Sequence, residues 1–167
     1  MTTKVAVAPW ASYRTWARVG QQPRVPTFGK RKTAHVYGAI ALDDASFTYQ
    51  FAKVFNAKTY LAFLKQLVAL HRTQKVFLIT DNGPCHNLDE AGREWLSQNA
   101  QRIQLHRLPP YSPEFNPMEP VWKVTRKMTT HNRFYATTHE RDRALRKTFR
   151  AFQRRPALIA AHVGRMQ

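Results

Sequence analysis

The chain reads Leu78-Ile-Thr-Asp81-Asn82-Gly-Pro-Cys-His86 and then Leu108-Pro-Pro-Tyr-Ser-Pro-Glu-Phe-Asn116-Pro-Met-Glu119-Pro-Val-Trp-Lys123, and this stretch decides the fold. An aspartate ends a short apolar strand, and a glutamate opens a helix further along the chain. Carboxylates at the ends of such elements can converge on one point, where they bind Mg²⁺ or a similar hard cation. Two cations held in this way can drive hydrolysis and transfer of phosphodiesters.

The charge of the chain is unusual. Its 167 residues include 27 Lys and Arg against 10 Asp and Glu, for a net charge of +17, while the apolar content of 43% is ordinary for a globular domain. A field of that sign attracts polyanions, and nucleic acid is the usual polyanion. A membrane surface fits less well, because no apolar run approaches the roughly 18 residues of a spanning helix.

Length and cysteine content favour a single cytoplasmic domain. A chain of 167 residues matches the length of one domain and can bury a substantial core. Its one cysteine, Cys85, excludes an intrachain disulfide, and the first residues contain no apolar leader. We therefore expect a cytoplasmic protein.

Hydrophobic periodicity predicts a mixed α/β fold. Residues 34–42 form a predicted strand, Asp43 and Asp44 a turn, and residues 46–51 a partner strand. The remaining predicted elements are a helix over 56–72, a strand over 75–80 that is buried on both faces, a helix over 88–100, a strand over 103–108, a helix over 116–128 and a basic helix from about 139. This order predicts a central sheet with helices on its faces, and sites at the carboxyl ends of its strands.

Asp81 lies at the carboxyl end of the most apolar predicted strand. It is either a metal ligand at the edge of the sheet or a turn aspartate before Asn82-Gly83, a strong turn pair. Asn82 and His86 are predicted to hold the Asp81 carboxylate in position without binding the metal themselves. For His86 the alternatives are a polar turn or capping residue and a contact to phosphate.

Glu119 has two interpretations that do not exclude each other. Asn116 is a credible N-cap, Pro117 suits the first helical position, and Glu119 would complete a capping box. The carboxylate could also pair with Lys123 one turn later. The functional interpretation is a second metal ligand, which the proline-rich loop before the helix would hold stiffly.

Basic residues near these carboxylates are predicted to contact DNA phosphates. The predicted DNA-binding residues are Lys30, Arg31, Lys32, Lys123, Arg126 and Lys127. On the predicted helix over 116–128, Val121, Val124 and Met128 form the apolar stripe, and the cations lie toward another face. A solvated basic surface is the alternative for all of them.

These motifs resemble the bacterial insertion-sequence transposases related to the mariner group, which carry the DDE superfamily endonuclease domain. The Pro-Pro-Tyr-Ser-Pro and Asn-Pro-x-Glu block is the most specific part, and the resemblance runs from about Pro9 to Arg155. It implies a ribonuclease H-like fold, a catalytic domain over 1–155 and a basic tail over 156–167. It also implies cleavage and transfer of DNA strands with Mg²⁺ or Mn²⁺ in the bacterial nucleoid. The candidate partners are DNA and a second copy of the chain.

The resemblance implies three catalytic acids, of which Asp81 and Glu119 match the second and third. The register of the first falls at or before Met1 and Thr2, which are not acids. We therefore expect an amino-terminally incomplete transposase domain with weak or no catalysis of its own, unless Asp43 or Asp44 replaces the absent acid. The alternative is a non-catalytic nucleic-acid-binding protein that has kept a transposase fold.

Overall fold

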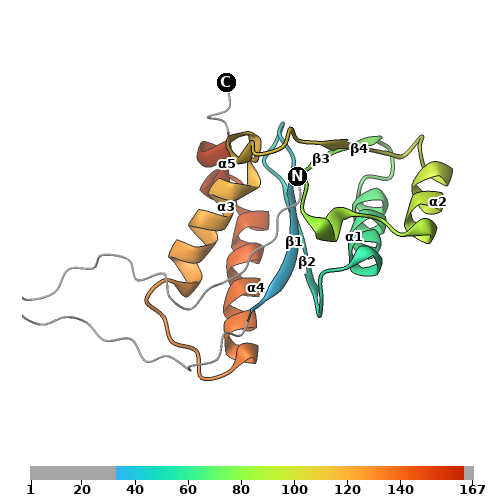
Figure 1. Cartoon of the computed structure of the whole chain (residues 1–167). Coiled ribbons are helices and arrows are strands. Elements are labelled where there is room, and N and C mark those ends of the chain that lie inside the picture. The colour runs from blue at the N-terminus through green and yellow to red at the C-terminus, as the bar shows by residue number, and fades with distance from the viewer. Residues whose placement is uncertain (1–32, 164–167) are drawn as a thin grey trace, which may run out of the picture.

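The computed structural model describes residues 33–163, which form a mixed α/β arrangement of strands and helices (Figure 1). The strands are β1 (His35–Ile40), β2 (Phe47–Ala52), β3 (Val76–Thr80) and β4 (Ile103–Arg107). The α-helices are α1 (Ala57–Leu70), α2 (Glu90–Gln98), α3 (Met118–Thr125), α4 (Thr138–Arg154) and α5 (Ala157–Val163). Shorter helical turns are η1 (Pro84–His86), η2 (Pro113–Phe115) and the π-helical η3 (Arg126–Thr130). The predicted mixed α/β class and the predicted order of elements are confirmed.

β1 and β2 form the predicted antiparallel hairpin, in a register that begins with His35 opposite Ala52. At the tip of the hairpin, Asp43 Oδ1 accepts the Asp44 N–H at 2.9 Å, and Asp44 Oδ1 accepts the Ser46 N–H at 2.7 Å. The hydrogen bond from Ser46 also holds the pKa of Asp44 below its usual value. Both aspartates therefore stabilise the turn, which is a common role for this residue.

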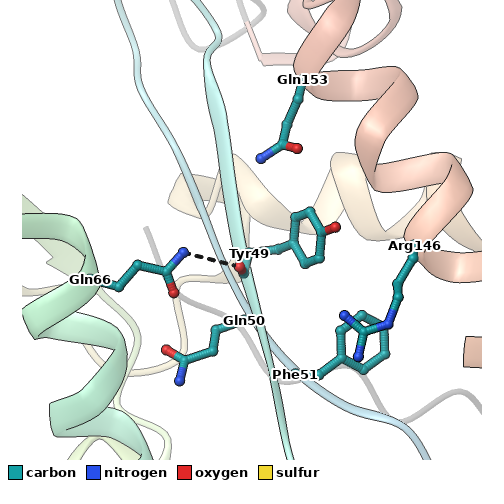
Figure 2. A pocket seen from close by; sticks show the side chains of 6 residues that line it. All are labelled: Tyr49, Gln50, Phe51, Gln66, Arg146 and Gln153. Carbon is teal, nitrogen blue, oxygen red and sulfur yellow. Dashed lines mark hydrogen bonds between the residues drawn. The ribbon is translucent and has the colours of Figure 1, made fainter. Parts of the chain in front are cut away.

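Side chains from two helices cover the outer edge of β2. The Gln66 side chain of α1 donates to the Tyr49 carbonyl at 3.4 Å, and the Gln153 side chain of α4 donates to the Phe47 carbonyl at 3.1 Å. Figure 2 shows the groove along this edge, between α1 and α4. Occupying the free carbonyls in this way discourages pairing with a strand of another molecule.

Within residues 33–163 the strands form two separate two-stranded sheets, β1–β2 and β3–β4, rather than the one predicted central sheet. One face of the β1–β2 sheet packs against α1. Asn56 caps this helix, because its side chain accepts the Thr59 N–H at 2.9 Å while the Thr59 hydroxyl accepts the Asn56 N–H at 3.1 Å. The buried residues of this core are Tyr37, Ala39, Tyr60, Phe63, Leu64, Leu67, Leu78, Cys85 and Ile103. They join β1, α1, β3 and β4 in one apolar cluster.

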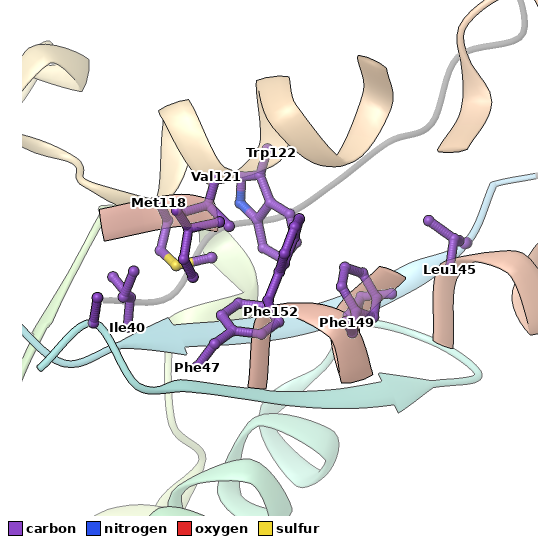
Figure 3. Close-up of a cluster of buried hydrophobic side chains, with 12 residues drawn as sticks. Ile40, Phe47, Met118, Val121, Trp122, Leu145, Phe149 and Phe152 are labelled. Carbon is purple, nitrogen blue, oxygen red and sulfur yellow. The ribbon is translucent and has the colours of Figure 1, made fainter. Parts of the chain in front are cut away.

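The other face of β1 and β2 packs against α3, α4 and α5 (Figure 3). Trp122 of α3 and Phe149 and Phe152 of α4 are buried there. Gly38 lies directly beneath α3, and a Cβ atom at this position would be 2.6 Å from Trp122 Cη2. The close approach of α3 to β1 therefore requires glycine at position 38.

The prediction that β3 is buried on both faces is wrong. Leu78 and Thr80 are buried, but the Phe77 side chain between them is 64% exposed. Its ring contacts the Lys75 ammonium at 5.5 Å rather than a helix. Within residues 33–163, β3 pairs with β4 alone and only one face of this pair is packed, so an apolar sequence did not guarantee burial.

The predicted apolar stripe of α3 is partly wrong. Val121 is buried and Val124 partly so, but Met128 is 39% exposed. The inward positions are instead completed by Thr125 and Thr129, whose hydroxyls have partners. Threonines with satisfied hydroxyls can occupy core positions, and apolar character alone does not identify them.

Part of the predicted basic tail belongs to the core. The predicted basic helix is α4, which ends at Arg154, and the chain continues as α5 after Pro156. Ile159 of α5 is fully buried in the cluster that contains α3 and α4. The division of the chain at residue 155 stays a prediction.

Candidate active site

The pairing of β3 and β4 places two chain segments at one edge of the sheet. The strands are parallel, so the residues that follow them leave at the same end. The Leu108 N–H donates to the Thr80 carbonyl at 2.9 Å, and the Asn82 side chain donates to the Leu108 carbonyl at 2.8 Å. Asp81 therefore lies at the edge from which the loop to Glu119 departs.

The Asp81 carboxylate is held by its own loop. Its Oδ1 accepts the Gly83 N–H at 2.9 Å and lies 2.9 Å from His86 Nδ1. The Asp81 side chain is 28% exposed, so it is shielded by the loop but still open to solvent on one side. The hydrogen bond expected of a turn aspartate is present, and it gives the carboxylate a fixed orientation, while the metal-ligand role stays a prediction.

His86 is a buried partner of Asp81. Its Nδ1 lies 3.0 Å from Thr80 Oγ1 and 3.2 Å from the Asp81 carbonyl, and only 2% of the residue is exposed. Burial lowers the pKa of this imidazole, but the Asp81 carboxylate and Cys85 outweigh that effect and raise the pKa to about 9. A charged imidazolium therefore faces the Asp81 carboxylate at neutral pH.

The environment of His86 contains aromatic residues that the sequence did not connect with the site. The rings of Tyr60 and Tyr37 lie 4.8 and 6.3 Å from the imidazole ring, between centroids. Arg107, at the end of β4, reaches the Asn87 side chain at 2.8 Å just beyond His86. No spacing rule relates these distant residues, so only the fold identifies them.

Glu119 lies in the first turn of α3. Asn116 precedes it, and the Asn116 side chain accepts the Met118 N–H at 3.0 Å. The helix begins at Met118 with Pro117 as its N-cap, one residue later than the predicted start with Asn116 as N-cap. The Asn116 N–H donates to the Pro113 carbonyl instead of to Glu119. Within residues 33–163 the Glu119 carboxylate makes no hydrogen bond and no ion pair. The predicted capping box and the predicted pair with Lys123 are therefore wrong, and the carboxylate is available.

A sequence profile of DDE superfamily endonucleases matches residues 3–141. The chain belongs to this family. The predicted membership of the DDE superfamily is thereby confirmed, while the predicted relation to the mariner group and the predicted bacterial origin stay predictions. Among curated proteins, no sequence matches the chain.

Solved structures of the Mos1 transposase share the fold of this DDE-family chain. The Mos1 strand transfer complex matches with a TM-score of 0.67 and 16% identity, over 99% of this chain and 49% of that chain. The Mos1 mariner paired-end complex with Mn matches with a TM-score of 0.67 and 15% identity, over 99% and 51%. A pre-cleavage Mos1 transpososome matches with a TM-score of 0.64 and 16% identity, over 98% and 53%. The predicted ribonuclease H-like fold is confirmed, and the chain spans about half the length of these proteins.

The described part of this DDE-family chain contains two candidate acids rather than three. No group of three His, Cys, Asp or Glu side chains within residues 33–163 could hold a metal ion together. Asp43 and Asp44 therefore do not join Asp81 and Glu119 in one cluster. Oxygen donors of this kind suit Mg²⁺ or Mn²⁺, although two carboxylates are fewer than a full site for a hard cation uses.

The predicted DNA-binding residues fall into two groups. Lys123 and Lys127 are exposed on α3 and η3, and Arg126 is partly buried between them. The cluster from Lys30 to Lys32 lies outside the described residues. The role of these cations in the DDE-family chain stays a prediction. Of the helices described, none is long and apolar enough to cross a membrane.

Proposed function

We propose that this chain is the catalytic domain of a DDE transposase that cleaves DNA strands and joins them to new ends. Family membership supports the reaction class. The observation that carries the proposal is the contrast between the surroundings of its two candidate acids, Asp81 and Glu119. Asp81 is oriented by Gly83 and His86, while Glu119 presents a carboxylate with no partner in the described chain.

Asp81 and Glu119 would hold the divalent cations that the family implies. When bound, such cations activate the attacking oxygen and stabilise the leaving oxygen of a phosphodiester. The chain's own contribution is to place the carboxylates. Gly83 and His86 fix Asp81 against rotation, and the bond from Asn82 to Leu108 ties this loop to the segment that leads to Glu119.

His86 has a positioning role in this proposal. Its Nδ1 lies 2.9 Å from Asp81 Oδ1, so the imidazolium keeps the carboxylate oriented before any cation arrives. The Thr80 hydroxyl at the end of β3 lies 3.0 Å from His86 Nδ1 and restricts rotation of the imidazole ring. Preorganised ligands of this kind reduce the cost of assembling a site.

A metal-binding experiment tests the two ligands. We expect Mn²⁺ to bind weakly to the wild-type chain, because two carboxylates provide an incomplete site. Binding should be lost in Asp81→Asn and in Glu119→Gln. It should be unchanged in Glu94→Gln, which removes the same charge from an exposed position on α2. Mn²⁺ relaxation or calorimetry provides the measurement, and equal binding in all four proteins would refute the assignment.

A non-catalytic DNA-binding protein is the second candidate function. The observation in its favour is the absence of a three-acid cluster within residues 33–163. It predicts DNA binding that is indifferent to divalent metal and to Asp81→Asn. The metal titration therefore separates the two candidates.

A further inference from the structure

Helix α4 carries a stripe of exposed cations. The residues of this α4 cation stripe are Arg143, Lys147, Arg150 and Arg154. They recur at intervals of four, three and four positions, so they lie on one face of the helix. The opposite face, which includes Leu145, Phe149 and Phe152, is buried against the sheet and α3.

Nothing in the described part of the chain neutralises the stripe. None of its four side chains makes a hydrogen bond or ion pair within residues 33–163. The acids of α4 are engaged elsewhere, because Asp142 pairs with Arg141 at 2.7 Å and Glu140 accepts the Ala136 N–H at 3.0 Å. Like charges one turn apart repel each other on a helix, so the stripe destabilises the folded chain.

The stripe is presented on a rigid support. Phe149 and Phe152 anchor α4 in the core, and Thr148 meets Thr129 of η3 at 2.7 Å between hydroxyl oxygens. On the flank of the helix, the Arg146 guanidinium stacks over the Phe51 ring at 4.1 Å. At a rise of about 1.5 Å per residue, the stripe extends for roughly 16 Å along the helix axis.

We propose that the α4 cation stripe binds the phosphate backbone of duplex DNA without regard to sequence. Its arginines offer forked donors that match phosphate oxygens, and such contacts fix the position of a duplex without reading its bases. Insertion of α4 into an anionic membrane fits less well, because a helix that lies in a membrane must expose its apolar face to the lipid. The apolar face of α4 is already occupied by the core.

This surface is separate from the proposed metal site. It uses no residue of the Asp81 loop and none of the predicted DNA-binding cations on α3. DNA held along α4 would therefore be bound whether or not metal is present, and the two proposals can fail independently.

Salt-dependent DNA binding by matched variants tests the proposal. The stripe variant replaces Arg143, Lys147, Arg150 and Arg154 by Gln. The control variant replaces Lys53, Lys58, Lys65 and Arg72 by Gln, four exposed cations in the region of α1. Both variants lower the net charge by four, from +17 to +13. Fluorescence anisotropy with a mixed-sequence duplex is measured over a series of salt concentrations.

We expect the log–log salt slope of the stripe variant to become shallower by about 3 to 4, since each phosphate contact contributes about 0.9. The control should change the slope by less than about 1. Arg143→Lys with Arg150→Lys and Arg154→Lys should keep the wild-type slope, because these substitutions retain each cation. Thermal unfolding of each variant verifies that α4 remains folded.

Three results would overturn the proposal. Equal slope changes in the stripe and control variants would mean that only net charge matters, and an unchanged stripe variant would mean that DNA binds elsewhere. A stripe variant that kept its DNA binding but lost binding to phosphatidylserine vesicles would assign the stripe to a membrane surface.

Discussion

At the scale of single residues, the carboxylates of Asp81 and Glu119 are held in position by different contacts. Asp81 is restrained by Gly83 and by the His86 imidazolium, whereas Glu119 depends on the stiffness of its helix start. A carboxylate beside a buried cation is stabilised in its ionised form. The pair therefore contributes to the folded state as well as to the proposed site.

The Asp81–His86 pair predicts a pH dependence of stability. Folding raises the pKa of His86 from 6.5 to about 9, so its contribution is complete below pH 6.5 and is lost as pH rises through about 9. A shift of this size corresponds to at most about 3 kcal/mol. Urea unfolding of the metal-free chain should show a falling free energy of unfolding across this window.

A matched pair of histidine variants checks that prediction. His86→Gln should remove the pH dependence between 6.5 and 9, because the titrating group is gone. His106→Gln, at an exposed position on β4, should keep it. A wild-type pH profile in the His86 variant would show that another group is responsible.

At the scale of elements, the packing of α3 on β1 sets the geometry around Glu119. Gly38 lets the Trp122 ring lie against the strand, and Met118 Cε would be 2.9 Å from a Cβ atom at the same position. Met118 and Glu119 are neighbours in the first turn of α3. A change beneath this turn therefore affects both the core and the start of the helix.

Gly38→Ala should destabilise the fold by about 1–3 kcal/mol, because the added methyl overpacks the core beneath α3. Alanine in a strand would otherwise be better than glycine by about 0.5–1 kcal/mol, so a destabilisation identifies the steric cause. Denaturant unfolding gives the difference. In a Trp122→Leu background the same substitution should cost less, and an unchanged cost would exclude the ring as its source.

At the scale of the whole molecule, attraction to DNA and catalysis depend on different features of the chain. The net charge of +17 provides attraction to DNA that does not depend on the acids. Catalysis depends on the positions of carboxylates that fix two cations. A chain of this kind can bind DNA well and cut it poorly.

We expect the 167-residue chain to show no metal-dependent nicking of plasmid DNA in Mg²⁺ or Mn²⁺. Residues 33–163 contain no cluster of three metal-binding side chains, and two carboxylates alone hold a cation poorly and leave the attacking oxygen poorly aimed. Robust, Asp81-dependent nicking by the 167-residue chain would contradict the prediction.

Local signals predicted much of the site. Asn56 caps α1, the Asn116 side chain accepts the Met118 N–H at the start of α3, and the hairpin around Asp43 and Asp44 forms as predicted. The sequence also singled out His86. It did not predict that Glu119 would have no partner in the described chain, because a capping box and a pair with the next turn were both chemically reasonable.

The sequence by itself determined the charge, the order of strands and helices, and the positions of both acids, because these depend on composition and on neighbours in the chain. Only the tertiary structure decided that Phe77 is exposed, that Thr125 and Thr129 are buried, and that the α4 cations face outward. These outcomes depend on which surfaces meet across the fold. A residue's own chemistry limits such contacts, but the packing of distant elements selects among them.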